Sequence, residues 1–230
     1  MRSLIKAVIA VVVLAGLLVG ADRIAVVVAQ NQAADKLAGR QGITGKPSVS
    51  IGDFPFLTDL ISRKVDSLHI SAAAVQLSGG GQSFQLNDFA ADLKGVQISG
   101  NESSATVDSG TGTGRVSYQQ VQTLLGLDSR MSLGYGGPGE VKVSASMLGQ
   151  KLGTSVKLRT EGNKVVVDSV GDLSGVGALP GISSAVSAAI GTKSFTLQGM
   201  PVGLDLDQVT PQPDGLALKF RGTNVHLSSN

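Results

Sequence analysis

The segment VGLDLDQVTPQPDGLALKF, residues 202–220, decides the fold class. Leucine, valine and phenylalanine alternate with polar or small residues on both sides of a centre rich in proline, aspartate and glycine. Alternation with a period of two is typical of a strand with one buried face, and the centre at 211–215 has the chemistry of a tight turn. The segment therefore predicts two antiparallel strands joined by a turn.

The same alternation extends outward from this segment over much of the chain. It is found in residues 65–98, where it changes phase near Ala73 and predicts a β-bulge, and again in residues 131–170. Glu161-Gly162-Asn163 has the chemistry of a hairpin turn. Residues 100–114 are rich in glycine, serine and threonine, which predicts a loop or an edge strand.

Short helices are predicted between these strands. One follows Asp53, which serves as its cap, and a second spans 117–125 with Ser117 as cap. A third spans 176–190, with Pro180 near its start. The helix after Asp53 carries an apolar stripe at helical spacing, made of Leu57, Leu60, Ile61, Lys64 and Val65.

A further helix is predicted at residues 24–38, and its apolar face is expected to dock on the rest of the domain. That face consists of Ile24, Val27, Val28, Asn31, Ala34, Leu37 and Ala38. Together, the elements predict an α+β fold in which a long, strongly curved antiparallel sheet wraps around a few helices. We expect a single domain over residues 22–230.

The N-terminus has the features of an export segment. Arg2 and Lys6 precede an apolar run at residues 7–21, which Asp22 and Arg23 interrupt. A run of this length predicts a signal peptide over residues 1–21, removed after Ala21, or a signal anchor that extends to residue 28. Both alternatives place the domain on the extracytoplasmic side of the cell membrane, secreted or N-terminally anchored.

Charge and composition exclude several classes of function. Residues 1–21 hold two of the 19 Lys and Arg residues and none of the 17 Asp and Glu residues, so the remainder carries 17 of each sign. Nucleic-acid binding needs a basic surface, which a formally neutral domain does not supply. The chain has no cysteine, so it has neither a disulfide nor a thiol nucleophile.

No catalytic or metal-binding motif is present, and we expect no enzyme activity and no cofactor. His69 and His226 are isolated in strand-like segments, and neither belongs to a pattern of metal ligands. Asp205 and Asp207 lie two residues apart on a predicted strand and are expected to face water. A paired acid and base would need a third group, which the sequence does not place beside them.

The unusual local feature is GDFPFL at residues 52–57, where two of the six phenylalanines lie close together. Phe54 and Phe56 do not belong to the apolar stripe of the helix that follows. They either fill the end of the core or line the mouth of a cavity that holds acyl chains. The sequence leaves both alternatives open.

The segment KPSVSIGDFPFL, residues 46–57, resembles the signature of the LmeA-like family of actinobacterial envelope proteins. GMPVGL at 199–204, DGL at 214–216 and GTNV at 222–225 resemble the same family, as does the leader followed by Asp22-Arg23. The resemblance covers nearly the whole chain. It implies a phospholipid-binding protein similar to tubular lipid-binding (TULIP-like) domains, with a role in assembling lipid-linked (lipomannan-type) glycans.

The resemblance carries over no catalytic motif. The expected partners are a phospholipid or another acyl-chain lipid and the membrane surface, with no nucleic acid, and the chain is expected to be monomeric. The alternative is a structural or interaction protein of the envelope with a filled core and no lipid cavity. The residues expected to contact lipid are Phe54, Phe56, Leu57, Leu60, Ile61, Val28, Leu68, Ile70, Phe84 and Phe89.

Overall fold

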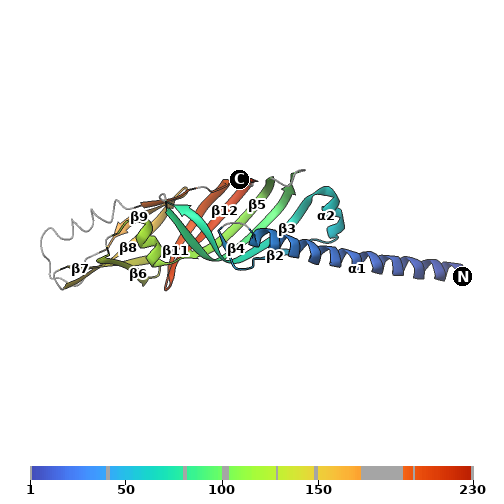
Figure 1. Ribbon diagram of the computed structural model, residues 1–230, viewed down its shortest axis with the longest axis horizontal. Helices are drawn as coiled ribbons and strands as arrows, with labels where there is room; N and C mark the ends of the chain where they lie inside the picture. The colour runs from blue at the N-terminus through green and yellow to red at the C-terminus, as the bar shows by residue number, and fades with distance from the viewer. Residues whose placement is uncertain are drawn as a thin grey trace.

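The computed structural model describes residues 2–39, 42–79, 82–99, 104–127, 129–147, 150–171, 194–198 and 200–228. Within these residues it contains three helices and a twelve-stranded antiparallel sheet. The sheet curls strongly, and helix α1 (Arg2–Ala38) projects from one end of it (Figure 1). The predicted combination of a strongly curved antiparallel sheet with a few helices is therefore confirmed.

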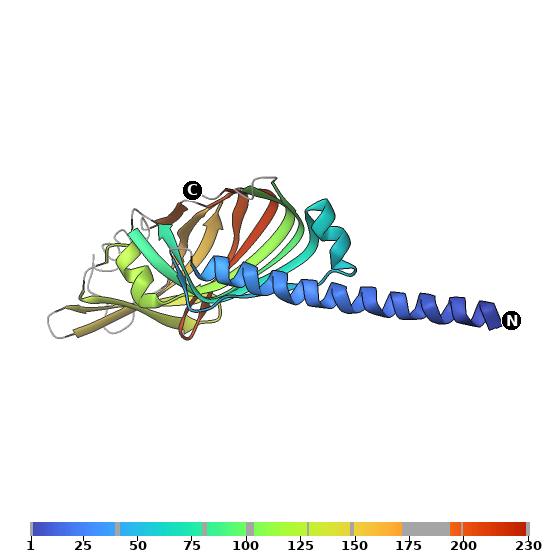
Figure 2. The ribbon, with the colours of Figure 1, turned by 45° about the vertical axis from the view of Figure 1, so that its right-hand side comes forward.

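The strand order across the sheet is β11-β12-β5-β4-β3-β10-β9-β8-β7-β6, and β1 and β2 pair with β3 beside this path. Its curvature gives the strands the outline of a half-barrel (Figure 2). The strands are β1 (Ile43–Thr44), β2 (Ser48–Ile51), β3 (Lys64–Gly79), β4 (Gln82–Ile98), β5 (Ser104–Val116), β6 (Met131–Gly137), β7 (Glu140–Met147), β8 (Gln150–Glu161), β9 (Lys164–Val170), β10 (Ser194–Gln198), β11 (Val202–Gln212) and β12 (Gly215–Ser228).

Several predicted strands and turns are confirmed. The segment at 202–220 forms β11, a turn and β12, with Gln212 opposite Gly215 at the end of the ladder. Leu216, Leu218 and Phe220 are buried, as the alternation predicts. The hairpin turn at 161–163 joins β8 to β9, and Gly162 has a φ of 55°, a conformation that glycine adopts without strain.

The segment predicted as a loop or an edge strand is instead an interior strand. Strand β5 lies between β4 and β12 and pairs with both along most of its length. Its glycines explain why the segment lacks an apolar alternation: a Cβ at Gly114 would lie 2.6 Å from Leu86 Cδ2, and one at Gly110 would lie 2.8 Å from Leu93 Cδ2. Large side chains of β4 thus occupy the space that β5 leaves empty.

The bulge predicted near Ala73 lies one strand away. β3 and β4 pair without a register shift, whereas β4 and β5 shift register between Asn87 and Ala90. Asp88, within this interval, has a φ of 51°. In the β3–β4 ladder, Ala72 pairs with Phe89 and Ala74 pairs with Asn87, so Asp88 lies opposite Ala73. The predicted bulge in β3 is therefore wrong, and the irregularity lies in β4.

Helix α1 docks on the domain with a face other than the predicted one. From residue 11 onward, the buried residues of α1 are Asp22, Val26 and Ala34, spaced by multiples of four. Ile24 and Val27 of the predicted stripe are exposed, while Ala34 is common to both sets. The helix contacts α2, β1 and β2. Because residues 24–28 are almost all apolar, periodicity alone did not distinguish the docking face from its neighbour.

Helix α2 (Phe56–Ser62) is shorter than predicted, since Lys64 and Val65 belong to β3. Its N-cap residue is Pro55, and Asp53 does not cap it. Helix α3 (Tyr118–Leu124) is as predicted, with Ser117 in a capping box with Gln120. The helix predicted at 176–190 lies outside the described residues.

Buried apolar side chains form two clusters. The larger joins β4, β5, α3 and the C-terminal strands to the β7–β10 part of the sheet, and Phe84 packs edge-on against Phe195 within it, with ring centroids 6.1 Å apart. The smaller, here called the α2-end cluster, has Val96, Val107 and Val225 at its centre. Its register places it next to α2, since Val65, just after α2, pairs with Val96.

Candidate functional site

The candidate site is the end of the domain at which α1, α2 and the α2-end cluster meet. In the two ribbon views, α2 lies beside α1 where α1 leaves the sheet (Figures 1 and 2). Six of the ten predicted lipid-contacting residues belong to this end: Phe54, Phe56, Leu57, Leu60, Ile61 and Leu68. The site therefore begins with the chain around α2.

The two phenylalanines of this segment have different surroundings. Phe56 is 3% exposed and fills the core beneath α2, whereas Phe54 is 63% exposed. The guanidinium of Arg23 lies 5.0 Å from the centre of the Phe54 ring, a distance that allows a cation–π interaction. Phe56 thus matches the first alternative, a place in the core, whereas Phe54 lies at the surface, and a contact of Phe54 with lipid stays a prediction.

Leu60 and Ile61 are also at the surface, with exposures of 59% and 85%, while Leu57 is half-buried. The stripe that predicted the helix therefore does not face the core. Phe56 alone is buried in α2 and holds this short helix on the domain. We call the exposed set Phe54, Leu60 and Ile61 the α2 tip.

Asp22 of α1 supplies the cap that α2 lacks in its own sequence. Its carboxylate accepts a hydrogen bond of 2.9 Å from the Leu57 N–H, in the first turn of α2, and is paired with Arg23. Arg23 also donates a hydrogen bond of 3.1 Å to the Asp53 carbonyl oxygen. Residues 22–23 thus fix α2 to the point where α1 leaves the domain.

Asp22 and Arg23 were not among the predicted site residues. The sequence does show them as a charged pair that interrupts an apolar run. It does not show which residues the pair contacts. The partner lies 35 residues away in the chain, and no spacing rule connects the two positions. Asp53, predicted as the cap, instead accepts a 2.7 Å hydrogen bond from the Asp66 N–H and so fixes the start of β3.

Carboxylates gather around α2. Partial burial raises the pKa of Asp59 above its ordinary value, and the negative charges of Asp53, Asp66 and Asp22 raise it further. Asp59 therefore binds a proton more readily than a free aspartate. In the described part of the chain, no group of three histidine, aspartate or glutamate side chains has the arrangement of a metal site.

The α2-end cluster gives this end of the domain an apolar surface on the sheet. Three buried valines at its centre are surrounded by apolar side chains that stay partly open to solvent. Leu68, one of the predicted residues, is in this ring and pairs across the ladder with Leu93. The partly buried members are Val65, Leu68, Leu93, Ala105, Leu204 and Leu227.

The other predicted residues lie elsewhere. Phe84 is fully enclosed in the larger core, and Phe89 packs against that core. Ile70 is half-buried in β3, two residues beyond Leu68. Val28 is 48% exposed on α1. Whether these four residues contact lipid stays a prediction.

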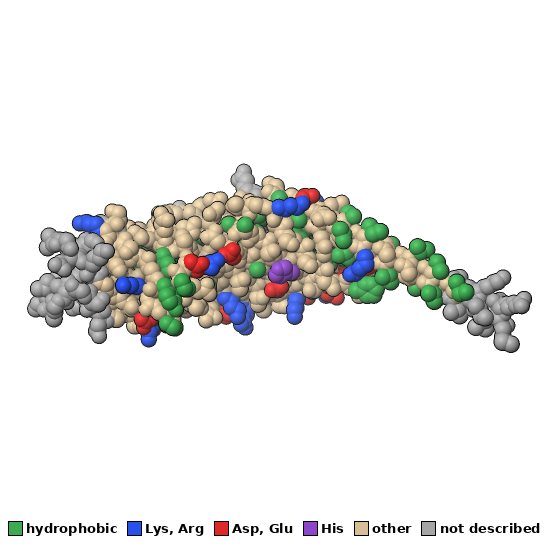
Figure 3. Space-filling model, turned by 90° about the horizontal axis from the view of Figure 1, so that it is seen from below, with side chains coloured by type: hydrophobic (Ala, Val, Ile, Leu, Met, Phe, Trp, Pro, Cys, Tyr) green, Lys and Arg blue, Asp and Glu red, His purple; other side chains and the backbone are tan. Residues whose placement is uncertain are grey.

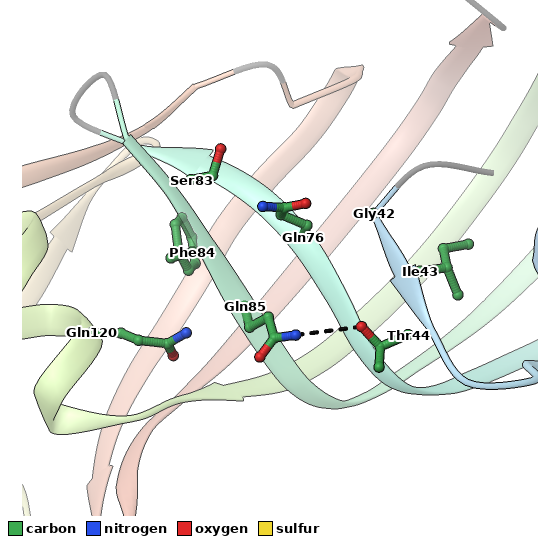
Figure 4. Close-up of a pocket in the computed structure, with 8 residues that line it drawn as sticks. All are labelled: Gly42, Ile43, Thr44, Gln76, Ser83, Phe84, Gln85 and Gln120. Carbon is green, nitrogen blue, oxygen red and sulfur yellow. Dashed lines mark hydrogen bonds between the residues drawn. The ribbon is translucent and has the colours of Figure 1, made fainter.

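A second candidate is a cavity of about 370 Å³ at the other end of β3 and β4 (Figure 4). It is mostly polar, and the side chains of Gln85 and Thr44 meet across it in a 3.3 Å hydrogen bond. It does not have the lining of the elongated apolar cavity that an acyl chain needs. Its lining residues are Gly42, Ile43, Thr44, Gln76, Ser83, Phe84, Gln85 and Gln120.

A third cavity, of about 40 Å³, lies between α3 and the sheet and has an apolar lining that includes Val121, Val141 and Leu216. It is far too small for an acyl chain. The Tyr118 hydroxyl donates a 2.7 Å hydrogen bond to the Gln212 carbonyl beside it, and burial raises the pKa of this phenol. Here the residues that the structure describes form a filled core.

Helix α1 is the feature that connects this end of the domain with a membrane. Residues Val11–Ala38 form a helix that is long and apolar enough to cross a bilayer, and signal sequences near an N-terminus share this property. Its side chains are exposed from residue 11 to residue 21. Hydrophobic side chains line the projecting part of α1 and continue onto the adjoining end of the domain (Figure 3).

Comparison with known proteins gives one match. The model of the LmeA-like phospholipid-binding family matches residues 20–221, which include α2, the docked part of α1 and all of the α2-end cluster except Val225 and Leu227. No curated protein and no solved structure matches the chain. The match begins just before Asp22, so it includes the part of α1 that docks on the domain.

Proposed function

Because the chain belongs to the LmeA-like phospholipid-binding family, we propose that it is an exported, non-catalytic phospholipid-binding protein of the cell envelope. The family is one of lipid-binding proteins and not of enzymes. We propose further that α1 stays attached and anchors the domain on the extracytoplasmic side of the membrane. The fold would then be of the TULIP-like kind, with the curved sheet presenting an apolar surface to lipid.

The observation that carries this proposal is the α2-end cluster. A ring of half-open leucine, valine and alanine side chains around three buried valines offers an acyl chain an apolar surface beside the anchor. Each methylene group that such a chain buries contributes about 0.8 kcal/mol. A few buried methylene groups would therefore supply most of the binding free energy, without a charged site for the headgroup.

The test is native mass spectrometry of the protein purified from its own membrane fraction. We expect a mass that retains residues 1–21, together with bound phospholipid. Leu93→Gln, in the α2-end cluster, should reduce the bound fraction, because it places an amide on the apolar surface. Leu133→Gln is the matched control, since Leu133 is also partly buried but packs against the larger core.

Three results would count against the proposal. A folded protein that carries no lipid and takes up none from vesicles would overturn the proposed lipid binding. Equal lipid loss in Leu93→Gln and Leu133→Gln would mean that the cluster is not the binding surface. A mature mass that begins at Asp22 would overturn the anchor and leave lipid binding untouched.

The second candidate function is a structural or interaction protein of the envelope. The filled core between α3 and the sheet favours it, because the described apolar cavity there measures only about 40 Å³. This candidate predicts lipid-free protein in the same experiment. Lipid-linked glycan assembly, which the family resemblance implies, is proposed as the process served, and shortened lipid-linked mannan in cells without the protein would support it.

A further inference from the structure

The α2 tip exposes three large apolar side chains within an eight-residue segment. Phe54, Leu60 and Ile61 have exposures of 63%, 59% and 85%. Single exposed apolar residues are ordinary, but a group of this kind commonly marks a surface that contacts a membrane or another protein. Here the choice between these two depends on how the tip is fixed to the rest of the chain.

The tip is fixed to α1 by several independent contacts. Asp22 accepts the hydrogen bond from the Leu57 N–H, three residues before Leu60, and Arg23 stacks on Phe54 while it bonds to the Asp53 carbonyl. All of these contacts come from two consecutive residues of α1. The tip therefore lies level with residues 22–23 of α1.

The length of α1 places this height at a membrane boundary. Its uncharged apolar run, residues 7–21, is about 22 Å long at 1.5 Å per residue, against about 30 Å of hydrocarbon. The missing 8 Å corresponds to about five more residues. Residues 22–28 add about 10 Å, and Ile24, Val27 and Val28 in this stretch are apolar and exposed.

A span that includes these residues carries Asp22 and Arg23 into the edge of the bilayer. An isolated charge there is costly, but these two are paired with each other, Asp22 accepts a hydrogen bond from α2, and Arg23 donates one to the Asp53 carbonyl just before α2. The Arg23 side chain is also about half exposed, and its length lets the guanidinium reach toward the headgroups. The charged pair is thus compatible with the position that the helix length requires.

We propose, on the basis of the proposed function and its retained anchor, that the α2 tip is a second membrane contact. It lies in the interfacial region of the leaflet from which α1 emerges, with Phe54, Leu60 and Ile61 among the upper acyl carbons. The occupant of this surface is the lipid bilayer, and continuity with α1 selects it over a second copy of the chain. The α2-end cluster then begins at the membrane surface, where an acyl chain reaches it without crossing water.

The chain is well suited to a direct test because it contains no tryptophan. Single tryptophans would be placed at the tip, as Ile61→Trp and Leu60→Trp, and at the opposite end, as Tyr135→Trp in β6. All three positions are exposed, so folding should be unaffected, and circular dichroism checks this. The full-length variants would be reconstituted in vesicles of phosphatidylcholine and phosphatidylglycerol with lipids brominated near the carbonyl end of the acyl chains.

We expect blue-shifted emission from both tip tryptophans and the loss of roughly half of it to bromine quenching, as for side chains that enter the interface. Tyr135→Trp should stay red-shifted and unquenched. Tip emission that matches the Tyr135→Trp control would overturn the proposal. A blue shift without quenching would also overturn it, because the tip would then pack against protein.

Native mass spectrometry of the same samples separates this proposal from the proposed function. Bound phospholipid together with unquenched tip tryptophans would overturn the membrane contact alone. Quenched tip tryptophans on a protein without lipid would keep the membrane contact and overturn lipid binding.

Discussion

Phe54 and Phe56 are separated by one residue, yet the first lies at the surface and the second is buried under α2. The sequence identified both as unusual and left two roles open for the pair, filling the core or lining a cavity mouth. Their separation follows from the way the start of α2 is held by Asp22 and Arg23, residues more than thirty positions earlier. Spacing within a segment predicts which residues share a face, but it does not predict a cap supplied by a distant part of the chain.

The cap gives a prediction for Asp22. Asp22→Ala removes the acceptor of the Leu57 N–H and should cost about 1–3 kcal/mol of local stability. Hydrogen exchange of the Leu57 amide, measured in detergent micelles, should then be roughly tenfold faster or more. Asp22→Asn should restore much of the protection, because its amide oxygen still accepts the bond.

The control for this prediction is Asp35→Ala. Asp35 also lies on α1 and pairs with Lys46 at 3.3 Å, but both side chains are 68% exposed. Exposed pairs contribute little, so Leu57 exchange should stay unchanged. An unchanged exchange rate in Asp22→Ala would show that other contacts, such as those of Arg23 and Phe56, are enough to hold α2 in place.

At the scale of elements, the sequence predicted best where one side of a strand is apolar and the other polar. The β11–β12 pair, the β8–β9 turn and α3 were all predicted from local patterns, and all are confirmed. It failed for β5 and for the docking face of α1. In β5 the apolar cover comes from neighbouring strands, and in α1 the residues 24–29 are apolar on every face of the helix, so neither pattern carries a distinguishing period.

The interior position of β5 gives a prediction for Gly114. A Cβ at this position would overlap the Leu86 side chain, which is 1% exposed and has no room to move. Gly114→Ala should therefore destabilise the fold by about 1–3 kcal/mol, seen as a lower urea midpoint. Gly134→Ala in β6 is the control, because no atom lies within 4 Å of its Cβ position.

A second variant shows whether Leu86 is the cause. In the Leu86→Ala background, Gly114→Ala should lose most of its own cost, since the overlapping atoms are gone. Equal costs in both backgrounds would place the strain in the backbone of β5 and not in the contact with β4.

At the scale of the whole molecule, anchor, tip and apolar cluster follow one another along one end of the domain. Asp22 and Arg23 of α1 hold α2, α2 leads directly into β3, and β3 carries Val65 and Leu68 of the α2-end cluster. This continuity was not predictable from the sequence, because it depends on which end of the sheet α1 leaves. The route of a lipid into the domain therefore depends on how α1, α2 and β3 are joined, and not on any one of these segments.

The route gives a kinetic prediction. The double substitution Leu60→Ser and Ile61→Ser removes the exposed apolar side chains of the tip and leaves the cluster intact. Uptake of fluorescent phospholipid from vesicles should slow about tenfold, while the amount bound at equilibrium stays the same. Val202→Ser on the edge strand β11, where the side chain is 75% exposed, is the control. Unchanged uptake in the double variant would mean that lipid reaches the cluster by another route.

The described strands of the sheet form a path with two ends, β11 and β6, and no ladder joins them. In a closed barrel, strand number and stagger fix the radius. An unclosed sheet is free of that relation, so the apolar surface of the α2-end cluster can widen or narrow with the curvature of the sheet. We therefore expect tolerance of acyl length and unsaturation: the extracted lipids should mirror the species distribution of the surrounding membrane.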